Sequence, residues 1–220
     1  MSKPFIYSKI AEGVHFVGRQ EEVKRLCTDF IFLTNTAVTA PQGRGKSSLI
    51  HKAALEARHM EKSLRFAFVE LSNVRNEERF FELLAQGVLK AVSKSQADVV
   101  ENVKKYFHGI TPRVAFDADG SFAVDFDWEE IRRNIEQLID LPFTVAKDMG
   151  VKMVVCIDDF SAISHFSDPD ALMDMFKTRW PRHTGVAYCI SSDPQPVTEK
   201  FLKSTPMFYR YGDMLSLGGI

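Results

Sequence analysis

The sequence predicts an α/β fold in which a parallel sheet lies between layers of helices, and two observations carry this prediction. Short apolar segments alternate with amphipathic helical segments along the chain, which is the order typical of a parallel sheet. The apolar segments have almost no polar interruptions, as expected for strands covered on both faces. A chain of 220 residues can bury one such core without disulfide or metal support, and all of 1–220 is expected to form a single domain.

The first elements follow from local patterns. Segment 36–40 is short, apolar and β-branched, which predicts a buried strand. A stripe of apolar residues predicts a helix over 45–59. The later predicted elements are a strand over 64–71, a helical region over 77–107 with a break in the nineties, one helix over 128–149, a strand over 151–157, a helix over 168–180, a strand over 185–190, a helix over 196–203 and a strand over 211–217.

Residues 112–126 alternate between apolar and polar around an Asp-Gly pair, which predicts a β-hairpin inserted at an edge of the sheet. A two-residue turn would pair Asp117 with Phe122. A three-residue loop instead pairs Phe116 with Phe122 and keeps the apolar face intact, so this register is preferred, with Gly120 left-handed.

Composition limits the classes of function. Lys and Arg total 28 against 29 for Asp and Glu, so the net charge is −1 and the chain is not polybasic. No apolar run reaches the ~18 residues of a membrane span, and residues 1–5 lack the apolar core of a secretory signal. Cys27, Cys156 and Cys189 form no Cys-x-x-Cys pair, so we expect buried, reduced cysteines and a cytoplasmic protein.

Other clusters have plainer interpretations. The hairpin acids do not match the calcium-loop spacing, because Gly120 comes too early, so we interpret them as solvated. The six histidines show no zinc-ligand spacing. The basic segment 179–183 is compatible with a nucleic-acid or protein contact, and more simply with cations that end a helix.

The most specific feature follows the first predicted strand. It has the pattern Gly-x-x-x-x-Gly-Lys-Ser of a phosphate-binding loop, except that Ala40 replaces the first glycine. A strand before it and a helix after it supply the expected context; a small-residue turn at a helix start is the alternative. The predicted nucleotide-binding residues of this loop are Pro41, Gln42, Gly43, Arg44, Gly45, Lys46, Ser47 and Ser48.

The chemistry of this loop follows from its residue types. Gly43 and Gly45 let backbone N–H groups approach phosphate oxygens. The helix that begins at Lys46 directs its positive end at the anion. We expect Lys46 to contact the β- and γ-phosphates as a catalytic point charge, Ser47 to bind Mg²⁺, and Ser48 to contact the α-phosphate side.

Two acids, Asp158 and Asp159, directly follow the apolar strand predicted over 151–157. This is the form of a Walker B strand, which places Asp158 at the carboxyl edge of the sheet as a Mg²⁺ ligand. Asp159 would polarise the attacking water as a catalytic residue, and because it is one methylene shorter than Glu, hydrolysis is expected to be slow. The alternative is that the pair caps the following loop. Ser191 and Ser192, after the next strand, are candidates to sense the γ-phosphate or to cap a helix.

Taken together, these residues resemble a known family. The segment that begins Phe16, Val17, Gly18, Arg19 is similar to a box found before the phosphate loop in AAA+-related ATPases. With the phosphate loop, the segment 157–160 and the late segment 206–210, it resembles the archaeal/bacterial P-loop ATPase family of the STAND branch, close to AAA+.

The resemblance implies a three-layer αβα P-loop NTPase core with an extra strand between the two Walker strands. It also implies that residues 16–19 border the adenine and that the nucleotide is ATP rather than GTP. Two hypotheses follow: an ATP-hydrolysing switch that acts on a protein partner or a further C-terminal module, and a nucleotide-binding scaffold without turnover. A third, the core of a DNA-handling ATPase, lacks support from this chain alone.

Length adds one expectation. The predicted elements use nearly all 220 residues, so no residues remain for a helical lid or a winged-helix module. We expect a core that binds nucleotide better than it hydrolyses it, since a lid that closes the site would be missing.

Overall fold

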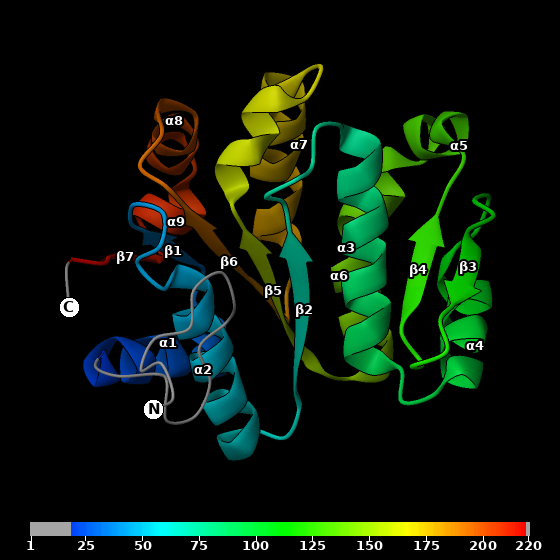
Figure 1. The fold of residues 1–220 in the computed structure, drawn as a ribbon, viewed down its shortest axis with the longest axis horizontal. Helices are drawn as coiled ribbons and strands as arrows, with labels where there is room; N and C mark the ends of the chain where they lie inside the picture. Colours follow the sequence, from blue (N-terminus) through cyan, green and yellow to red (C-terminus); the bar gives the residue numbers. More distant parts are fainter. Residues whose placement is uncertain (1–18, 219–220) are drawn as a thin grey trace, which may run out of the picture.

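A computed structural model describes residues 19–218 of the chain. Five parallel strands form one sheet in the order β2-β5-β6-β1-β7 (Figure 1). Its strands are β1 (Thr36–Thr39), β2 (Leu64–Glu70), β5 (Lys152–Asp158), β6 (Val186–Ser192) and β7 (Asp213–Ser216). Because β6 pairs with both β1 and β5, it separates the strand before the predicted phosphate loop from the predicted Walker B strand, as expected.

Helices cover both faces of the sheet. The α-helices are α1 (Gln20–Phe32), α2 (Lys46–Met60), α3 (Glu77–Val92), α4 (Gln96–Tyr106), α5 (Trp128–Arg133), α6 (Ile135–Met149), α7 (Pro169–Arg179), α8 (Pro196–Ser204) and α9 (Pro206–Tyr209). Two 3-10 helices, η2 (Phe160–His165) and η3 (Trp180–Arg182), flank α7. Side chains of α1 and α2 pack on one face of the sheet, and those of α3, α6, α7 and α8 pack on the other.

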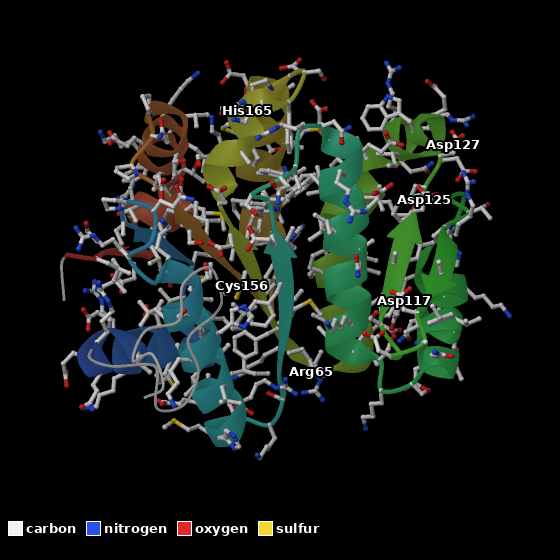
Figure 2. All side chains as sticks on the ribbon, viewed as in Figure 1. Arg65, Asp117, Asp125, Asp127, Cys156 and His165 are labelled. Carbon is white, nitrogen blue, oxygen red and sulfur yellow. The ribbon has the colours of Figure 1, made fainter. Side chains whose placement is uncertain are left out.

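The alternation of side chains along the strands assigns each residue to a face. In β5, Val154 and Cys156 belong to the cluster with α1 and α2, whereas Val155 and Ile157 belong to the cluster with α3 and α6. All three cysteines are free and buried, as predicted. Cys156, labelled in Figure 2, marks the α1–α2 face of the central strands.

The hairpin has the predicted register but a different neighbour. β3 (Arg113–Phe116) pairs with β4 (Phe122–Asp125) so that Phe116 lies opposite Phe122, and Gly120 has a φ of 85°. Figure 1 shows the hairpin on the outer side of α3, away from the five strands. The side chain of Gln86 on α3 donates to the carbonyl of Phe122, so the hairpin is attached to a helix rather than to the sheet edge.

The prediction of one helix over 128–149 is wrong in one respect, since the structure has two helices there. Asn134 separates α5 from α6 with a φ of −125° and a ψ of 21°. Its side-chain amide donates to the carbonyl of Glu130 at 2.8 Å and to that of Gly109 at 3.4 Å. A side chain that bonds to nearby backbone competes with the helical ladder, which explains the break. Asp127 and Gly150 cap the two ends as predicted.

The patterns also did not predict α1, η2, η3 or α9. Within residues 19–218, no helix is both long enough and apolar enough to cross a membrane.

Candidate functional site

The glycines of the predicted phosphate loop are in the backbone conformation that such a loop requires. Gly43 and Gly45 have φ values of 77° and 79°, and α2 begins at the next residue, Lys46. A Cβ would meet no atom within 4 Å at either glycine, so the requirement is for a left-handed backbone rather than for space. Ala40 does not have a positive φ, so its Cβ is accommodated where the usual motif has glycine.

The loop is open to solvent at its tip and buried at its base. Pro41, Gln42 and Arg44 are exposed, Lys46 and Ser47 are half-buried, and Ser48 is buried at the start of α2. An anion can therefore reach the backbone N–H groups of the loop and of the first turn of α2, where the partial positive charge of the helix is located.

Lys46 lies between the loop and the end of β6. Its ammonium group donates to the carbonyl of Ala40 at 2.8 Å and to that of Pro41 at 3.4 Å. It also forms an ion pair with Asp193 at 2.6 Å, and its side chain is only 10% exposed. The sequence patterns did not single out Asp193, although it directly follows the serine pair at the end of a predicted strand.

Asp158 connects three segments that are far apart in the sequence. The hydroxyl of Ser47, at the start of α2, donates to Oδ2 of Asp158, and the hydroxyl of Ser191, on β6, donates to Oδ1. Ser191 therefore lies in the candidate site as a neighbour of Asp158.

Ser192 points to the opposite face of the sheet. Its hydroxyl donates to the carbonyl of Asp193 and forms a 2.9 Å hydrogen bond with the hydroxyl of Thr198 on α8. Consecutive residues of a strand face opposite sides, so Ser191 and Ser192 cannot both face the phosphate loop. Of the two sensor candidates, the structure places only Ser191 beside Asp158.

Asp159 leaves the strand at a sharp turn. Its φ is 58° and its ψ is 46°, a left-handed conformation that is rare for residues other than glycine. Its Oδ1 accepts a hydrogen bond from the hydroxyl of Ser161 at 3.1 Å, and its carbonyl accepts from the N–H of Ala162. Its backbone N–H donates to Oδ1 of Asp158. Asp159 thus has the contacts of a residue that begins η2.

A further acid, Glu70, ends β2 next to Asp158. The two residues are Cα partners in the parallel pairing of β2 with β5. Loss of solvation raises the pKa of the Glu70 carboxyl, and the negative charges of Asp158 and Asp159 raise that pKa further. The sequence contained a signal for this residue, because an acid at the carboxyl end of a predicted parallel strand faces the same edge as the phosphate loop.

Phe16, Val17 and Gly18 lie outside the described residues. Arg19, the last residue of the predicted adenine box, precedes α1 and has a φ of 59°. Its guanidinium donates to the carbonyl of Gly218, which follows β7, at 2.8 Å. Within the described part of the chain, Arg19 thus connects α1 to the residues that follow the last strand.

The donor set at the site suits Mg²⁺. A serine hydroxyl and one carboxylate are hard oxygen ligands, and Mg²⁺ usually takes one or two protein ligands, completing its shell with waters and substrate phosphates. Across 19–218, no cluster of three or more His, Cys, Asp or Glu side chains could hold a metal ion by itself. Figure 2 shows Asp117 and Asp125 on the hairpin and Asp127 at the start of α5, and all three are exposed, as expected for solvated acids.

Comparison with solved structures identifies the fold. The chain is similar to the Walker-type ATPase of Pyrococcus abyssi, with a TM-score of 0.59 and 14% identity over 97% of this chain and 57% of that one. It is similar to the ORC2 protein of Aeropyrum pernix, solved in ADPNP and ADP complexes, with a TM-score of 0.58 and 13% identity over 97% of this chain and 51% of that one. It is also similar to the ORC1 protein of the same organism, solved in complex with DNA, with a TM-score of 0.55 and 11% identity over 92% of this chain and 46% of that one.

The chain thus spans about half the length of these structures. No protein-family model matches the sequence, and no curated protein matches it. At 11–14% identity the likeness concerns the fold. A parallel five-stranded sheet between two helical layers, with a glycine-rich loop that leads from β1 into α2, gives the chain the fold of a P-loop NTPase.

Proposed function

We propose that this chain binds ATP with Mg²⁺ at the phosphate loop, hydrolyses it slowly, and acts as a nucleotide-dependent switch. The observation that supports it most strongly is the convergence of Lys46, Ser47 and Asp158 at the carboxyl edge of the sheet, beside a loop with two left-handed glycines. The alternative interpretation of the loop, a turn of small residues that only starts a helix, would not require the contacts that Asp158 makes.

Each residue has a role in this proposal. The N–H groups of residues 43–48 bind the phosphates, and the Lys46 ammonium neutralises charge on the β- and γ-phosphates. Ser47 and Asp158 hold Mg²⁺, which when bound offsets the negative charge of the phosphates. Ser191 orients the Asp158 carboxylate by hydrogen bonding, as a positioning residue.

ATP is preferred over GTP for two reasons. The sequence contains no Asn-Lys-x-Asp guanine-binding motif. The similar ORC2 structure was solved with the adenine nucleotides ADPNP and ADP. Residues 16–19 are proposed to border the adenine, on the strength of the family resemblance.

The switch part of the proposal rests on the pair formed by Lys46 and Asp193. Asp193 precedes α8, and α8 leads through α9 to β7. A phosphate that draws the Lys46 ammonium away from Asp193 changes the interactions of this C-terminal segment. In this way the nucleotide state would alter the contacts of this segment with a protein partner or a further module.

Nucleotide-dependent thermal stabilisation tests binding. At a ligand concentration 100 times the Kd, a ligand that binds only the folded state stabilises it by about 2.7 kcal/mol. We expect ATP with Mg²⁺ to raise the Tm more than GTP or metal-free ATP does, and Lys46→Ala to lose that increase. Lys52→Ala, on the same helix but paired with Glu56, is the matched control. No increase with any nucleotide would overturn the proposal.

A scaffold without turnover is the second candidate, and the position of Asp159 favours it, because the left-handed backbone of this residue turns it out of β5 and into the start of η2. Phosphate release separates the two candidates. Release by the wild type that does not exceed release by Lys46→Ala would favour the scaffold.

DNA handling is a third candidate, favoured by the likeness to ORC1 solved with DNA. Binding of duplex DNA that weakens steeply as salt rises would support it. The near-neutral net charge of −1 leads us to expect weak binding by this chain alone.

A further inference from the structure

Two acids at the ends of neighbouring strands share one position in the sheet. β2 and β5 run parallel and side by side (Figure 1). They stay in register over seven residue pairs, the last of which is Glu70 with Asp158. Neighbouring strands lie about 4.8 Å apart, so the Cα atoms of such partners are close. The backbone N–H of Leu71 donates to the carbonyl of Asp158 at 3.0 Å, which continues the pairing to the end of both strands.

Both acids also face the side of the sheet that carries the phosphate loop. On β2, Leu64 and Phe66 pack in the cluster with α1 and α2, and Glu70 follows them at an even spacing on the same strand. Asp158 follows Val154 and Cys156 in the same way on β5. Because side chains alternate along a strand, Glu70 and Asp158 project toward α2, whose first residues form the base of the phosphate loop.

Asp159, the acid expected to polarise water, turns out of β5 toward η2. Asp159 follows the strand in a left-handed conformation, and its carboxylate accepts a hydrogen bond from Ser161 at the start of η2. The Glu70 carboxylate likewise accepts a hydrogen bond, from the backbone N–H of Ser72 at 3.0 Å to Oε1, so the two acids differ in where they point and in exposure, Asp159 being half-buried. The Glu70 side chain is exposed, so water can reach it.

We propose that Glu70 is the catalytic residue that orients the attacking water and accepts its proton, in place of Asp159. This inference rests on the ATP hydrolysis proposed above. The water oxygen forms a bond to the γ-phosphorus while the bond from that phosphorus to the β–γ bridging oxygen breaks, and the electron pair of the broken bond leaves with ADP. The proton of the water goes to the Glu70 carboxylate and then to solvent. A positioned carboxylate fits this role as general base.

Two substitutions that keep shape and remove charge distinguish the two acids. In the full chain with Mg²⁺, we would measure kcat for phosphate release, the Kd for ATP and the Tm of the wild type, Glu70→Gln and Asp159→Asn. Glu101→Gln, at an exposed position on α4, is the matched control. A general base typically contributes a factor of 10² to 10⁴.

We expect Glu70→Gln to lower kcat by about 100-fold or more. Its Kd for ATP should change by less than about threefold, because in this role Glu70 contacts water rather than the phosphates. Its Tm should stay unchanged or rise, since the substitution removes a negative charge beside Asp158 and Asp159. A purely structural role would instead lower the Tm together with kcat. Asp159→Asn should keep kcat within about fivefold of the wild type.

Several results would overturn the inference. One is a Glu70→Gln variant that retains kcat, and another is an Asp159→Asn variant that loses as much as Glu70→Gln does. Loss of ATP binding in Glu70→Gln would assign Glu70 to holding the metal or the nucleotide instead. A wild type that binds ATP but releases no more phosphate than Lys46→Ala would overturn hydrolysis and this role together, while leaving nucleotide binding intact. A wild type that does not bind ATP would overturn the proposed function itself.

Discussion

The ammonium of Lys46 lies 2.6 Å from a carboxylate oxygen of Asp193, a residue 147 positions further along the chain. Phosphate oxygens must compete with this carboxylate for the ammonium, and the negative charge of Asp193 also repels them. We therefore expect Asp193→Asn to tighten ATP binding several-fold, with a larger effect at low ionic strength, where charges are screened less. Titration of a fluorescent ATP analogue at two salt concentrations would measure the change.

The control for this prediction is Asp174→Asn, which removes an acid that pairs with Lys177 on the exposed side of α7. That variant should bind the analogue as the wild type does. Weaker binding by Asp193→Asn would mean that Asp193 helps to form the nucleotide site rather than competing with the nucleotide.

The two serines at the end of β6 give a second prediction, because they face opposite sides of the sheet. Ser191→Ala removes a hydroxyl that donates to Asp158, so it should weaken Mg²⁺-dependent ATP binding. Ser192→Ala leaves the buried hydroxyl of Thr198 without this partner and should destabilise the fold by about 1–3 kcal/mol while ATP binding is kept. Urea denaturation and nucleotide titration of both variants would check this. The reverse pattern would contradict the assigned faces.

A carboxylate pair between α1 and β7 predicts a dependence of stability on pH. The pKa of Asp29 is raised from 3.8 to about 7, chiefly by burial and further by the hydrogen bond and charge of Asp213. Arg25, which pairs with Asp213, and Thr36, which donates to Asp29, act in the opposite direction. Between pH 3.8 and about 7 the folded state therefore binds more protons than the unfolded state.

This contribution of Asp29 to stability is fully present at low pH and is lost as the pH rises through about 7. The difference in the free energy of unfolding between Asp29→Asn and the wild type should therefore shift in favour of the variant from about pH 5 to about pH 8. Equilibrium urea denaturation at the two pH values would measure it. A difference that does not change between them would show that Asp29 titrates normally in the folded state.

Local patterns predicted the parts of this fold that depend on local chemistry. The strand alternation, the left-handed Gly120 and the caps at Asp127 and Gly150 are each determined by a few neighbouring residues. The break at Asn134 is also local, since its amide donates to the carbonyl of Glu130, but the apolar spacing over 128–149 does not show which polar side chain turns back onto the backbone. The position of the hairpin was missed because its attachment to α3 is a tertiary contact.

In the candidate site, too, the sequence did not predict what depends on tertiary contacts. Lys46, Ser47 and Asp158 belong to motifs with fixed spacing, so the sequence indicated them directly. Asp193 and Glu70 follow predicted strands, but strand pairing, β6 beside β1 and β2 beside β5, is what brings them into the site. No local spacing encodes which strands are neighbours, and register decides which side chains share a face.

A close approach between a helix and the sheet gives a last prediction, on stability. Gly87 lies in α3, where it packs on β2, and a Cβ at this position would come within 2.7 Å of the backbone carbonyl oxygen of Phe68. In a helix, glycine is normally about 1 kcal/mol less favourable than alanine, so Gly87→Ala would be expected to stabilise an isolated α3. In the folded chain, however, the clash is with backbone, which cannot move aside without shifting the helix away from the sheet. We therefore expect Gly87→Ala to destabilise the protein by about 1–3 kcal/mol, the typical range for an overpacked core.

Gly218→Ala, where a Cβ would meet nothing within 4 Å, should change the free energy of unfolding by less than about 0.5 kcal/mol. Urea denaturation of both variants beside the wild type would test this, and an equal or higher stability of Gly87→Ala would show that α3 does not pack this closely on β2.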